Sequence, residues 1–207
     1  MPAQTDTYFY EPASGHGLPH DPFKAIVAPR PIGWISTRDR QGRANLAPYS
    51  FFNAFSSAPP IIGFSSEGHK DSVSNAEATG EFVANFVSRP LAEAMNRTSA
   101  PVGPEVDELQ LAGLKAAACR LVAAPRVAAA PAALECKLLQ VVRLRDLAGK
   151  ELESYLVLGQ VVGVHIDQRY LRDGRFDIAA AQPIMRAGYR ADYAELGGIF
   201  EMFRPTS

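Results

Sequence analysis

Alternating apolar and polar residues dominate this chain and predict β-strands along most of its length. The run over residues 32–38 is strand-like, and the sequence Asp39-Arg-Gln-Gly42 that follows it is typical of a turn. Residues 43–47 would then return antiparallel, so a hairpin is the first predicted element. A short apolar run at 61–64 and the alternation over residues 81–87 predict two further strands.

The second half of the chain carries the longest strand signals. Residues 134–145 alternate in character, and the turn sequence Asp146-Leu-Ala-Gly149 leads into an apolar run over residues 155–164. The apolar face of the first strand carries Leu134, Cys136, Leu138, Val142 and Leu144, and the opposite face carries Glu135, Lys137, Arg143 and Arg145. We therefore expect a second hairpin, in which one strand has an apolar and a charged face.

Two short helices are predicted between these strands. Residues 70–79 have helical character, with Asp71 or Ser72 as the N-terminal cap and Gly80 as the stop, and a second helix spans residues 91–98. Strands outnumber helices and do not alternate regularly with them. This favours a mainly β fold, a closed or nearly closed antiparallel barrel with accessory helices, over a doubly wound sheet.

Length and charge limit the class of protein. The chain has 207 residues, 47% of them apolar, which suffices for one domain with a sizeable core. Its 21 Lys and Arg residues against 22 Asp and Glu give a net charge of -1, so no overall field attracts nucleic acid or anionic membranes. No basic region precedes an apolar stretch at the N-terminus, and no segment approaches the ~20 apolar residues of a membrane helix. We expect a soluble, cytoplasmic protein that binds neither nucleic acid nor membranes.

The cysteines and the N-terminal prolines refine this picture. Cys119 and Cys136 lie far apart and form no C-x-x-C pair, so we expect neither a disulfide framework nor a cysteine zinc site, and a reducing compartment suits this usage. Proline and glycine crowd the first thirty residues, which is typical of an extended, irregular arm. We therefore divide the chain into an arm over residues 1–20 and one domain over residues 21–207, without a bound metal.

The segment from Asn45 to Asn53 is the most informative candidate for ligand binding. It follows a predicted strand and combines Pro48, a polar pair and two aromatic residues. Such a loop offers backbone N–H and C=O groups beside aromatic surface, which suits a flat heteroaromatic ring with imide edges. A turn flanked by core aromatic residues fits the same pattern. No G-x-G-x-x-G or G-x-x-x-x-G-K sequence follows a strand, so a Rossmann or phosphate-loop site is not predicted.

A candidate anion site lies at the start of the first predicted helix. Lys70 and Ser72 could hold a phosphate through the ammonium group, the hydroxyl and the backbone N–H groups of the helix N-terminus. Simple capping by Asp71 or Ser72 beside a solvated lysine is the alternative. Ser36 and Thr37, at the end of the strand before the hairpin turn, are further hydroxyls that could face the same anion.

Several segments in a fixed order carry a family resemblance. They are residues 30–53, Lys70-Asp71-Ser72, Asn85-Phe86-Val87, Gly159-x-Val161-x-x-x-His165-Ile166-Asp167 and Tyr189-x-x-x-Tyr193-x-x-x-Gly197-Gly198-x-Phe200. Together they resemble the flavin reductase-like proteins of the FMN-binding split-barrel superfamily, in particular the flavoredoxin-like branch. The resemblance covers roughly residues 20–203. Ser72 stands where threonine is common, and Phe200 where tyrosine is frequent.

The resemblance implies a six-stranded split β-barrel of Greek-key type, a homodimer, and FMN in a groove near the dimer interface. Carried over to this chain, it assigns phosphate binding to Ser36, Thr37, Lys70 and Ser72, and the isoalloxazine lining to Ala47, Tyr49, Ser50 and Phe51, with Asn53 nearby. His165 would stand near the flavin face that receives a nicotinamide, or else be a partly buried structural histidine. Trp34 is expected in the core.

The implied function is that of an FMN-dependent oxidoreductase. NADH or NADPH would bind transiently and reduce the flavin, and the electrons would pass to a partner oxygenase, another redox protein or a small acceptor. Two alternatives remain open from the sequence. One is an FMN-binding electron carrier that no nicotinamide reduces directly. The other is a split-barrel enzyme that uses the groove for another ligand, such as a pyridoxal-type phosphate.

Overall fold

The structure, a computed structural model, describes residues 7–205. The strands are β1 Arg30–Pro31, β2 Gly33–Arg38, β3 Ala44–Tyr49, β4 Phe52–Ser57, β5 Pro60–Glu67, β6 Glu81–Asn85, β7 Ala116–Ala117, β8 Arg126–Val127, β9 Ala132–Arg145, β10 Glu151–Ile166, β11 Leu171–Arg172, β12 Arg175–Phe176, β13 Ile184–Arg186 and β14 Tyr193–Glu195. The helices are η1 Pro12–Ser14, α1 Phe23–Ile26, α2 Asp71–Thr79, η2 Arg89–Leu91, α3 Ala92–Arg97, α4 Glu108–Leu111, η3 Gln168–Tyr170 and α5 Ile178–Ala181.

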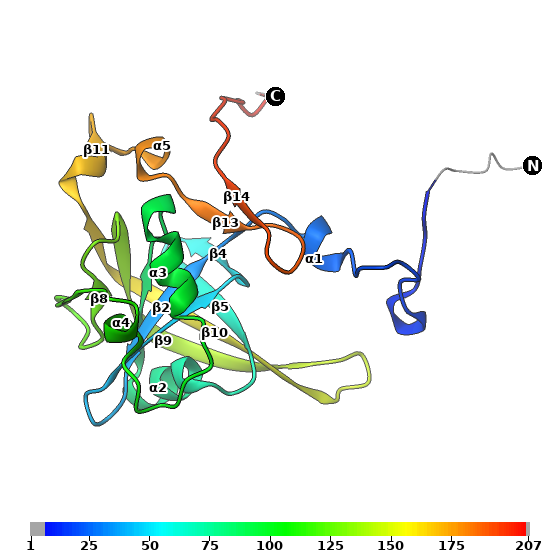
Figure 1. Cartoon of the computed structure of the whole chain (residues 1–207), viewed down its shortest axis with the longest axis horizontal. Helices are drawn as coiled ribbons and strands as arrows, with labels where there is room; N and C mark the ends of the chain where they lie inside the picture. The colour runs from blue at the N-terminus through cyan, green and yellow to red at the C-terminus, as the bar shows by residue number, and fades with distance from the viewer. Residues whose placement is uncertain (1–6, 206–207) are drawn as a thin grey trace, which may run out of the picture.

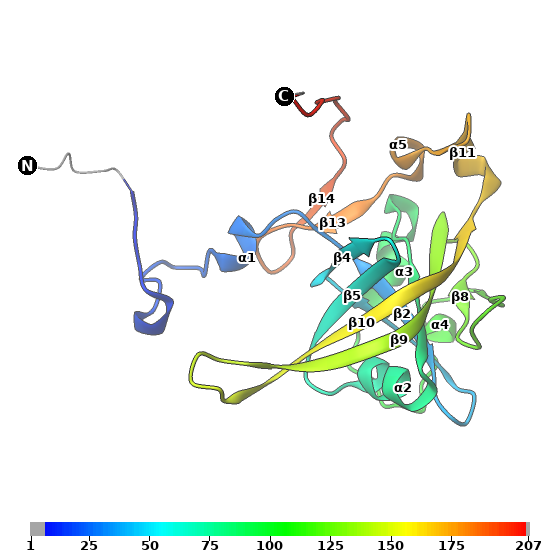
Figure 2. The same cartoon turned by 180° about the vertical axis from the view of Figure 1, so that it is seen from behind.

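A seven-stranded antiparallel sheet forms the body of the molecule, in the order β3-β2-β6-β9-β10-β5-β4 (Figures 1 and 2). Its two edge strands, β3 and β4, follow each other directly in the sequence and are joined by Ser50 and Phe51 alone. Because two residues connect the opposite edges, the sheet must curl until those edges are neighbours. The N–H of Ser65 on β5 donates to the C=O of Phe51 over 2.8 Å and holds this corner.

This topology confirms the predicted antiparallel split barrel with accessory helices. The resemblance implied six strands, and the sheet has seven. The difference lies at the corner, since β3 and β4 would count as a single strand if Ser50 and Phe51 did not bend the chain between them.

The first predicted hairpin is confirmed. Residues of β2 pair antiparallel with β3 from Gly33 opposite Tyr49 to Arg38 opposite Ala44. One carboxylate oxygen of Asp39 accepts hydrogen bonds from the N–H groups of Gln41 and Arg43, at 2.9 and 2.8 Å, which closes the turn locally.

The helix predicted over residues 70–79 is α2, which lies at one end of the barrel (Figures 1 and 2). It ends at Gly80, whose φ of 73° is left-handed, as a glycine stop requires. The predicted cap was wrong, because Lys70 occupies the N-cap position and no side chain caps the helix. Ser72 instead turns inward, where its hydroxyl accepts a hydrogen bond from the side chain of Asn45 over 2.9 Å.

The core confirms the expected position of Trp34. This side chain is fully buried, and its indole N–H donates to the hydroxyl of Thr98, at the C-terminal end of α3, over 2.9 Å. A second core cluster fills the barrel, where the ring of Phe64 packs between Tyr49 and Phe82 at centroid distances of 4.7 and 5.4 Å.

The charged face predicted for residues 134–145 is only partly exposed. Glu135 is 1% exposed because the segment 119–124 lies across this face of β9. The N–H groups of Ala123 and Ala124 reach Glu81 on the neighbouring strand β6 in the same way. Alternation predicted the faces of residues 134–138 correctly, but a register irregularity between Leu138 and Gln140 reverses the faces beyond it, so Val141 and not Val142 packs against the core. It also missed the covering segment.

The described parts of the termini extend from the barrel. Residues 7–22 run outward as an irregular arm, and the chain after β14 is also extended (Figure 1). Residues 1–6 of the predicted arm lie outside the described residues. Within residues 7–205, no helix is both long and apolar enough for a membrane span.

Candidate functional site

The free edge of β3 positions the segment that the sequence singled out. The N–H of Leu46 points away from β2, since it donates to the carboxylate of Glu108 on α4 over 3.0 Å. Residues two apart on a strand direct their backbone groups to the same side, so Pro48 also directs its C=O away from β2. Proline has no N–H to leave unpaired and is therefore tolerated at a sheet edge. The edge thus turns a backbone carbonyl away from the sheet beside the β3–β4 corner.

Burial of Glu108 raises the pKa of this carboxyl, although the hydrogen bond from Leu46 opposes the shift. The nearby acidic groups of Asp71 and Asp107 raise it further. The hydrogen bond from Leu46 connects α4 to β3. Burial and the neighbouring acidic groups make the ionised form of this carboxyl unfavourable.

A cavity of about 790 Å³ adjoins Pro48 and Ser50. Its volume lies within the ~300–1,000 Å³ that small-molecule sites occupy. Its other walls come from η2 and α3 and from the β13–β14 hairpin. Those walls carry Arg89, Glu93, Met95, Asn96, Ser99, Ile184, Arg186, Arg190, Tyr193 and Glu195 among others.

The charges in this cavity favour an anion. Three arginines and two glutamates line the cavity. One of these arginines forms an ion pair, since Arg89 contacts Glu195 over 2.8 Å. Arg186 lies 4.8 Å from the ring centroid of Tyr193 and donates to the C=O groups of Asp192 and Arg190. These contacts hold the Arg186 side chain in the hairpin. The cavity therefore combines a free backbone edge with fixed positive charge.

A second hollow of about 450 Å³ lies on the other side of the corner. Ser50 borders both cavities, and Phe51, Asn53 and Phe55 line only this one. The ring of Phe51 has Lys24 and Arg30 at 5.7 and 5.8 Å from its centroid. The structure therefore brings Ser50, Phe51 and Asn53 together at one hollow, and their contact with a flavin stays a prediction.

Buried hydroxyls gather where α2 meets the barrel. The side-chain amide of Asn45 donates to the hydroxyls of Ser72 and Thr37, at 2.9 and 3.3 Å, and Asn75 donates to Thr37 over 3.1 Å. Lys70 is exposed at the start of the same helix. Thr37, Lys70 and Ser72 thus share one end of the barrel, but both hydroxyls are buried and hydrogen-bonded to protein.

Tyr49 and Ala47 point their side chains into the barrel core. Burial raises the pKa of Tyr49, and hydrogen bonding with Ser72 and Ser66 opposes that shift. The phenol therefore connects the corner to the polar residues around α2. A ring placed at the β3 edge would meet Pro48 and Ser50 before either of these side chains.

Ser36 lies apart from the other predicted phosphate residues. Successive strand residues point to opposite faces, so Ser36 faces away from Thr37. Its hydroxyl is fully buried, donates to the C=O of Pro125 over 2.5 Å and accepts from the side chain of Asn85 over 3.1 Å. The structure thus assigns Ser36 to the contact between β2 and the loop before β8.

His165 also lies apart from the corner. The strand pairing connects His165 to Pro48 step by step across the sheet. His165 on β10 pairs with Ala133 on β9, which pairs with Asn85 on β6, and Asn85 pairs with Trp34 on β2, which pairs with Pro48 on β3. These are four strand spacings, or about 19 Å along the sheet at about 4.8 Å each. Within one chain His165 therefore does not join the residues around Ser50, and its proposed nicotinamide contact stays a prediction.

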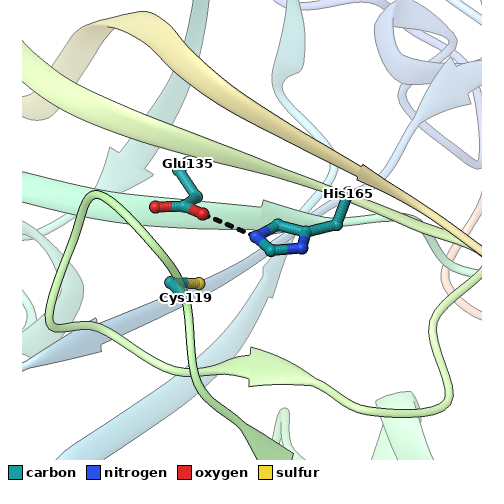
Figure 3. A group of neighbouring side chains, drawn as sticks. All are labelled: Cys119, Glu135 and His165. Carbon is teal, nitrogen blue, oxygen red and sulfur yellow. Dashed lines mark hydrogen bonds and ion pairs between the residues drawn. The ribbon is translucent and has the colours of Figure 1, made fainter.

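The neighbours of His165 are Glu135 and Cys119 (Figure 3). Its Nε2 lies 2.5 Å from Oε1 of Glu135. Burial alone would raise the pKa of Glu135, but hydrogen bonds from the N–H groups of residues 120–122 and from His165 hold it below the ordinary value. Burial and the Glu135 carboxylate raise the pKa of the Cys119 thiol to about 11, so it is protonated at neutral pH.

Sequence reasoning missed Arg186 and Arg190. Arg190 lies inside the C-terminal motif that contributed to the resemblance and Arg186 just before it, but that motif is defined by its aromatic residues and glycines. It also chose Ala47 and Tyr49 over Pro48. A signal was present, because proline in a strand indicates an edge and strand alternation then places residues 48 and 50 on the free side.

The groups that a flavin requires are present at two places along β3. Its planar ring system needs a cavity with backbone partners for its imide edge, and Pro48 and Ser50 border one of adequate volume. Its phosphate needs a cation and N–H donors, which Lys70 and the α2 N-terminus offer. The residues that would hold it are Pro48, Ser50, Lys70 and the first turn of α2.

Comparisons with known proteins agree with this geometry. The family model of the flavin reductase like domain matches residues 27–179. The protein BH2278 of Halalkalibacterium halodurans is 34% identical over 87% of this chain and 88% of its own length.

Two solved structures share the fold over most of both chains. Nitrilotriacetate monooxygenase component B from Bacillus cereus has a TM-score of 0.82 and 30% identity, covering 87% of this chain and 90% of that one. The 2-nitrobenzoate 2-nitroreductase NbaA of Pseudomonas fluorescens has a TM-score of 0.78 and 26% identity, covering 89% of each chain. The chain is a flavin-related oxidoreductase and belongs to the family of proteins with a flavin reductase like domain.

Proposed function

We propose that the protein binds FMN at the β3–β4 corner and catalyses its reduction by NADH or NADPH. The observation that carries this proposal is the free edge of β3, where Pro48 and Ser50 border a cavity of about 790 Å³ in a chain of this family. When bound, FMN would supply the redox chemistry, and the protein would supply position and charge.

Each group of residues has a separate task in this proposal. The C=O of Pro48 and the backbone of Ser50 would orient the flavin ring in the corner. Lys70 and the N-terminus of α2 would bind the phosphate, with Thr37 and Ser72 in support. The rigid barrel strands would hold the reacting ring systems face to face, which lowers the entropic part of the barrier.

The arginines of the cavity indicate an anionic co-substrate. Arg186 and Arg190 line the same cavity as Ser50 and would attract the diphosphate of a nicotinamide dinucleotide. The structurally similar NbaA is named as a 2-nitrobenzoate 2-nitroreductase, and 2-nitrobenzoate, like a dinucleotide diphosphate, is an anion. A reduced nicotinamide could therefore lie with its charged part on the β13–β14 hairpin.

Anaerobic stopped-flow mixing tests the proposal. FMN-saturated protein should lose its visible flavin absorption after mixing with NADH or NADPH, at a rate that saturates with nicotinamide concentration. Bleaching by dithionite but by neither nicotinamide would contradict the reductase function and indicate an electron carrier. Failure to bind FMN at all would contradict both.

Electrons from the reduced protein would pass to a second acceptor. The name of the neighbouring component B places that protein in a monooxygenase system, which supports an oxygenase partner here. Another redox protein or a small acceptor would serve the same chemical role.

We also propose that the working form is a homodimer. Apolar side chains beside the Phe51 hollow are exposed in the single chain, namely Ile26, Val27 and Phe55. Covering them with a second copy would bury this surface next to the flavin corner.

Sedimentation should therefore give a mass of about twice 22.4 kDa at micromolar concentration. Phe55→Asp should shift the protein toward monomer, because a charge would replace a 57% exposed ring in the contact. Leu111→Asp is the matched control, since Leu111 is 48% exposed on α4, outside this hollow. A folded, FMN-saturated wild-type monomer would contradict the dimer.

A further inference from the structure

Three side chains that the proposed function does not use meet on one face of the barrel. Cys119 comes from the segment between β7 and β8, Glu135 from β9 and His165 from β10 (Figure 3). Their sulfur, oxygen and nitrogen ligand atoms all lie within 4.8 Å of one another. We propose that these residues bind a divalent transition metal of the Zn²⁺ class.

The ligand set matches the chemistry of such a metal. Thiolate, imidazole and carboxylate are the ligands that Zn²⁺ takes from proteins. With bonds of about 2.0–2.3 Å, the ligand atoms of a tetrahedral site lie roughly 3.3–3.8 Å apart. The present cluster is near this size, so binding needs only small movements of the three side chains.

The carboxylate is held in place before a metal arrives. Both oxygens of Glu135 accept backbone hydrogen bonds, from the N–H groups of Arg120 at 2.9 Å, Leu121 at 2.6 Å and Val122 at 3.0 Å. Oε1 also lies 2.5 Å from Nε2 of His165, within hydrogen-bond distance. A metal would take the place of the hydrogen between these two atoms, and Oε1 would keep its bond from Arg120. Hydrogen-bonded carboxylates of this kind are typical of metal sites.

The charges balance when the metal binds. The Cys119 thiol releases its proton to solvent and the His165 ring binds as the neutral imidazole, so thiolate and carboxylate together neutralise the divalent ion. Two other charged groups act on the thiol, the carboxylate of Glu81 and the guanidinium of Arg126. Lys137 pairs with Glu81 over 2.7 Å, so these outer groups, two cations and one carboxylate, leave one net positive charge outside the site.

Solvent can reach one side of the cluster. The side chain of His165 is 20% exposed and Cys119 is half-buried, whereas Glu135 forms the floor of the site. A water molecule can therefore complete four-coordination, as in zinc sites with three protein ligands. Such a site would fasten the segment 119–124 to β9 and β10, far from the flavin corner.

Cobalt substitution tests this inference on the FMN-saturated protein. After removal of metals by chelation and dialysis, Co²⁺ should bind with one ion per chain. Its thiolate ligand should give a charge-transfer band in difference spectra, where the flavin absorption cancels. Added Zn²⁺ should abolish the band by competition. Absence of the band from the wild-type protein would overturn the inference and leave a hydrogen bond between Glu135 and His165.

Two cysteine variants make the test specific. Cys119→Ala should abolish the band and weaken Zn²⁺ binding by more than the roughly 10–100-fold that loss of an outer-shell partner costs. His165→Gln should weaken binding similarly. Cys136→Ala is the control, because Cys136 is fully buried in the barrel core and lies outside the cluster. Loss of the band in Cys136→Ala alone, or its survival in Cys119→Ala, would contradict the assignment. Thermal unfolding of each metal-free variant shows that it is folded.

Discussion

Replacing Lys70 by alanine is expected to weaken FMN binding about 10- to 150-fold and to leave riboflavin binding almost unchanged. A charge-assisted contact to phosphate contributes about 1.5–3 kcal/mol, and ~1.4 kcal/mol corresponds to a tenfold change in affinity. Lys70 is exposed at the N-cap of α2, so the protein should fold without it. Titration of both flavins by fluorescence quenching measures the difference.

Two variants serve as controls for this experiment. Lys70→Arg keeps the positive charge and should retain most of the affinity for FMN. Lys150→Ala removes an exposed lysine from the β9–β10 turn and should change neither flavin. Equal losses of both flavins in Lys70→Ala would reveal a structural role, and no loss of either would place the phosphate elsewhere.

Glu135→Ala is expected to lower the free energy of unfolding by about 3–5 kcal/mol, since each of three buried N–H donors left without a partner costs about 1–3 kcal/mol. The carboxylate accepts three backbone N–H groups and faces His165, and it is almost fully buried. The variant would leave those donors without a partner. In a domain of this size the loss corresponds to a fall in Tm of roughly 6–20 °C, which thermal unfolding followed by circular dichroism measures.

Glu135→Gln should rescue little of this loss. Both carboxylate oxygens of Glu135 accept N–H donors, so either orientation of the substituted amide would turn its NH₂ group against at least one of them. Glu153→Gln is the control, because Glu153 is exposed on β10 and its contact with Arg143 is a surface ion pair worth at most about 1 kcal/mol. Equal stabilities of Glu135→Ala and the wild type would show that the segment 119–124 does not depend on this carboxylate.

Local signals in the sequence determined several elements. The β2–β3 hairpin was predictable because the Asp39 turn closes through bonds between residues two and four apart. The end of α2 was predictable because Gly80 adopts a left-handed conformation that other residues avoid. The order of the motifs was enough to indicate the family, and the family model and the topology agree with it.

Only the tertiary structure decided which surfaces of those elements are covered. Alternation predicted that Glu135 and Cys136 lie on opposite faces of their strand. It did not predict that the segment 119–124 covers Glu135, because that contact joins residues 13 to 15 apart across a loop without a periodic pattern. In the same way Ser36 meets Pro125 from 89 residues away. The cap of α2 was missed because Ser72 has a better partner in Asn45, 27 residues earlier in the chain.

The candidate sites also differ in whether the sequence or the tertiary structure reveals them. The sequence by itself indicated the segment around Ser50 and the lysine at the start of α2 as candidates, since each is a short continuous motif. The tertiary structure decided that the β3 edge faces a cavity with Arg186, and that Cys119, Glu135 and His165 meet on one face. The physical reason is that a curled sheet brings together residues whose spacing in the chain follows no period, so their meeting depends on how the strands pair and how the loops cover them.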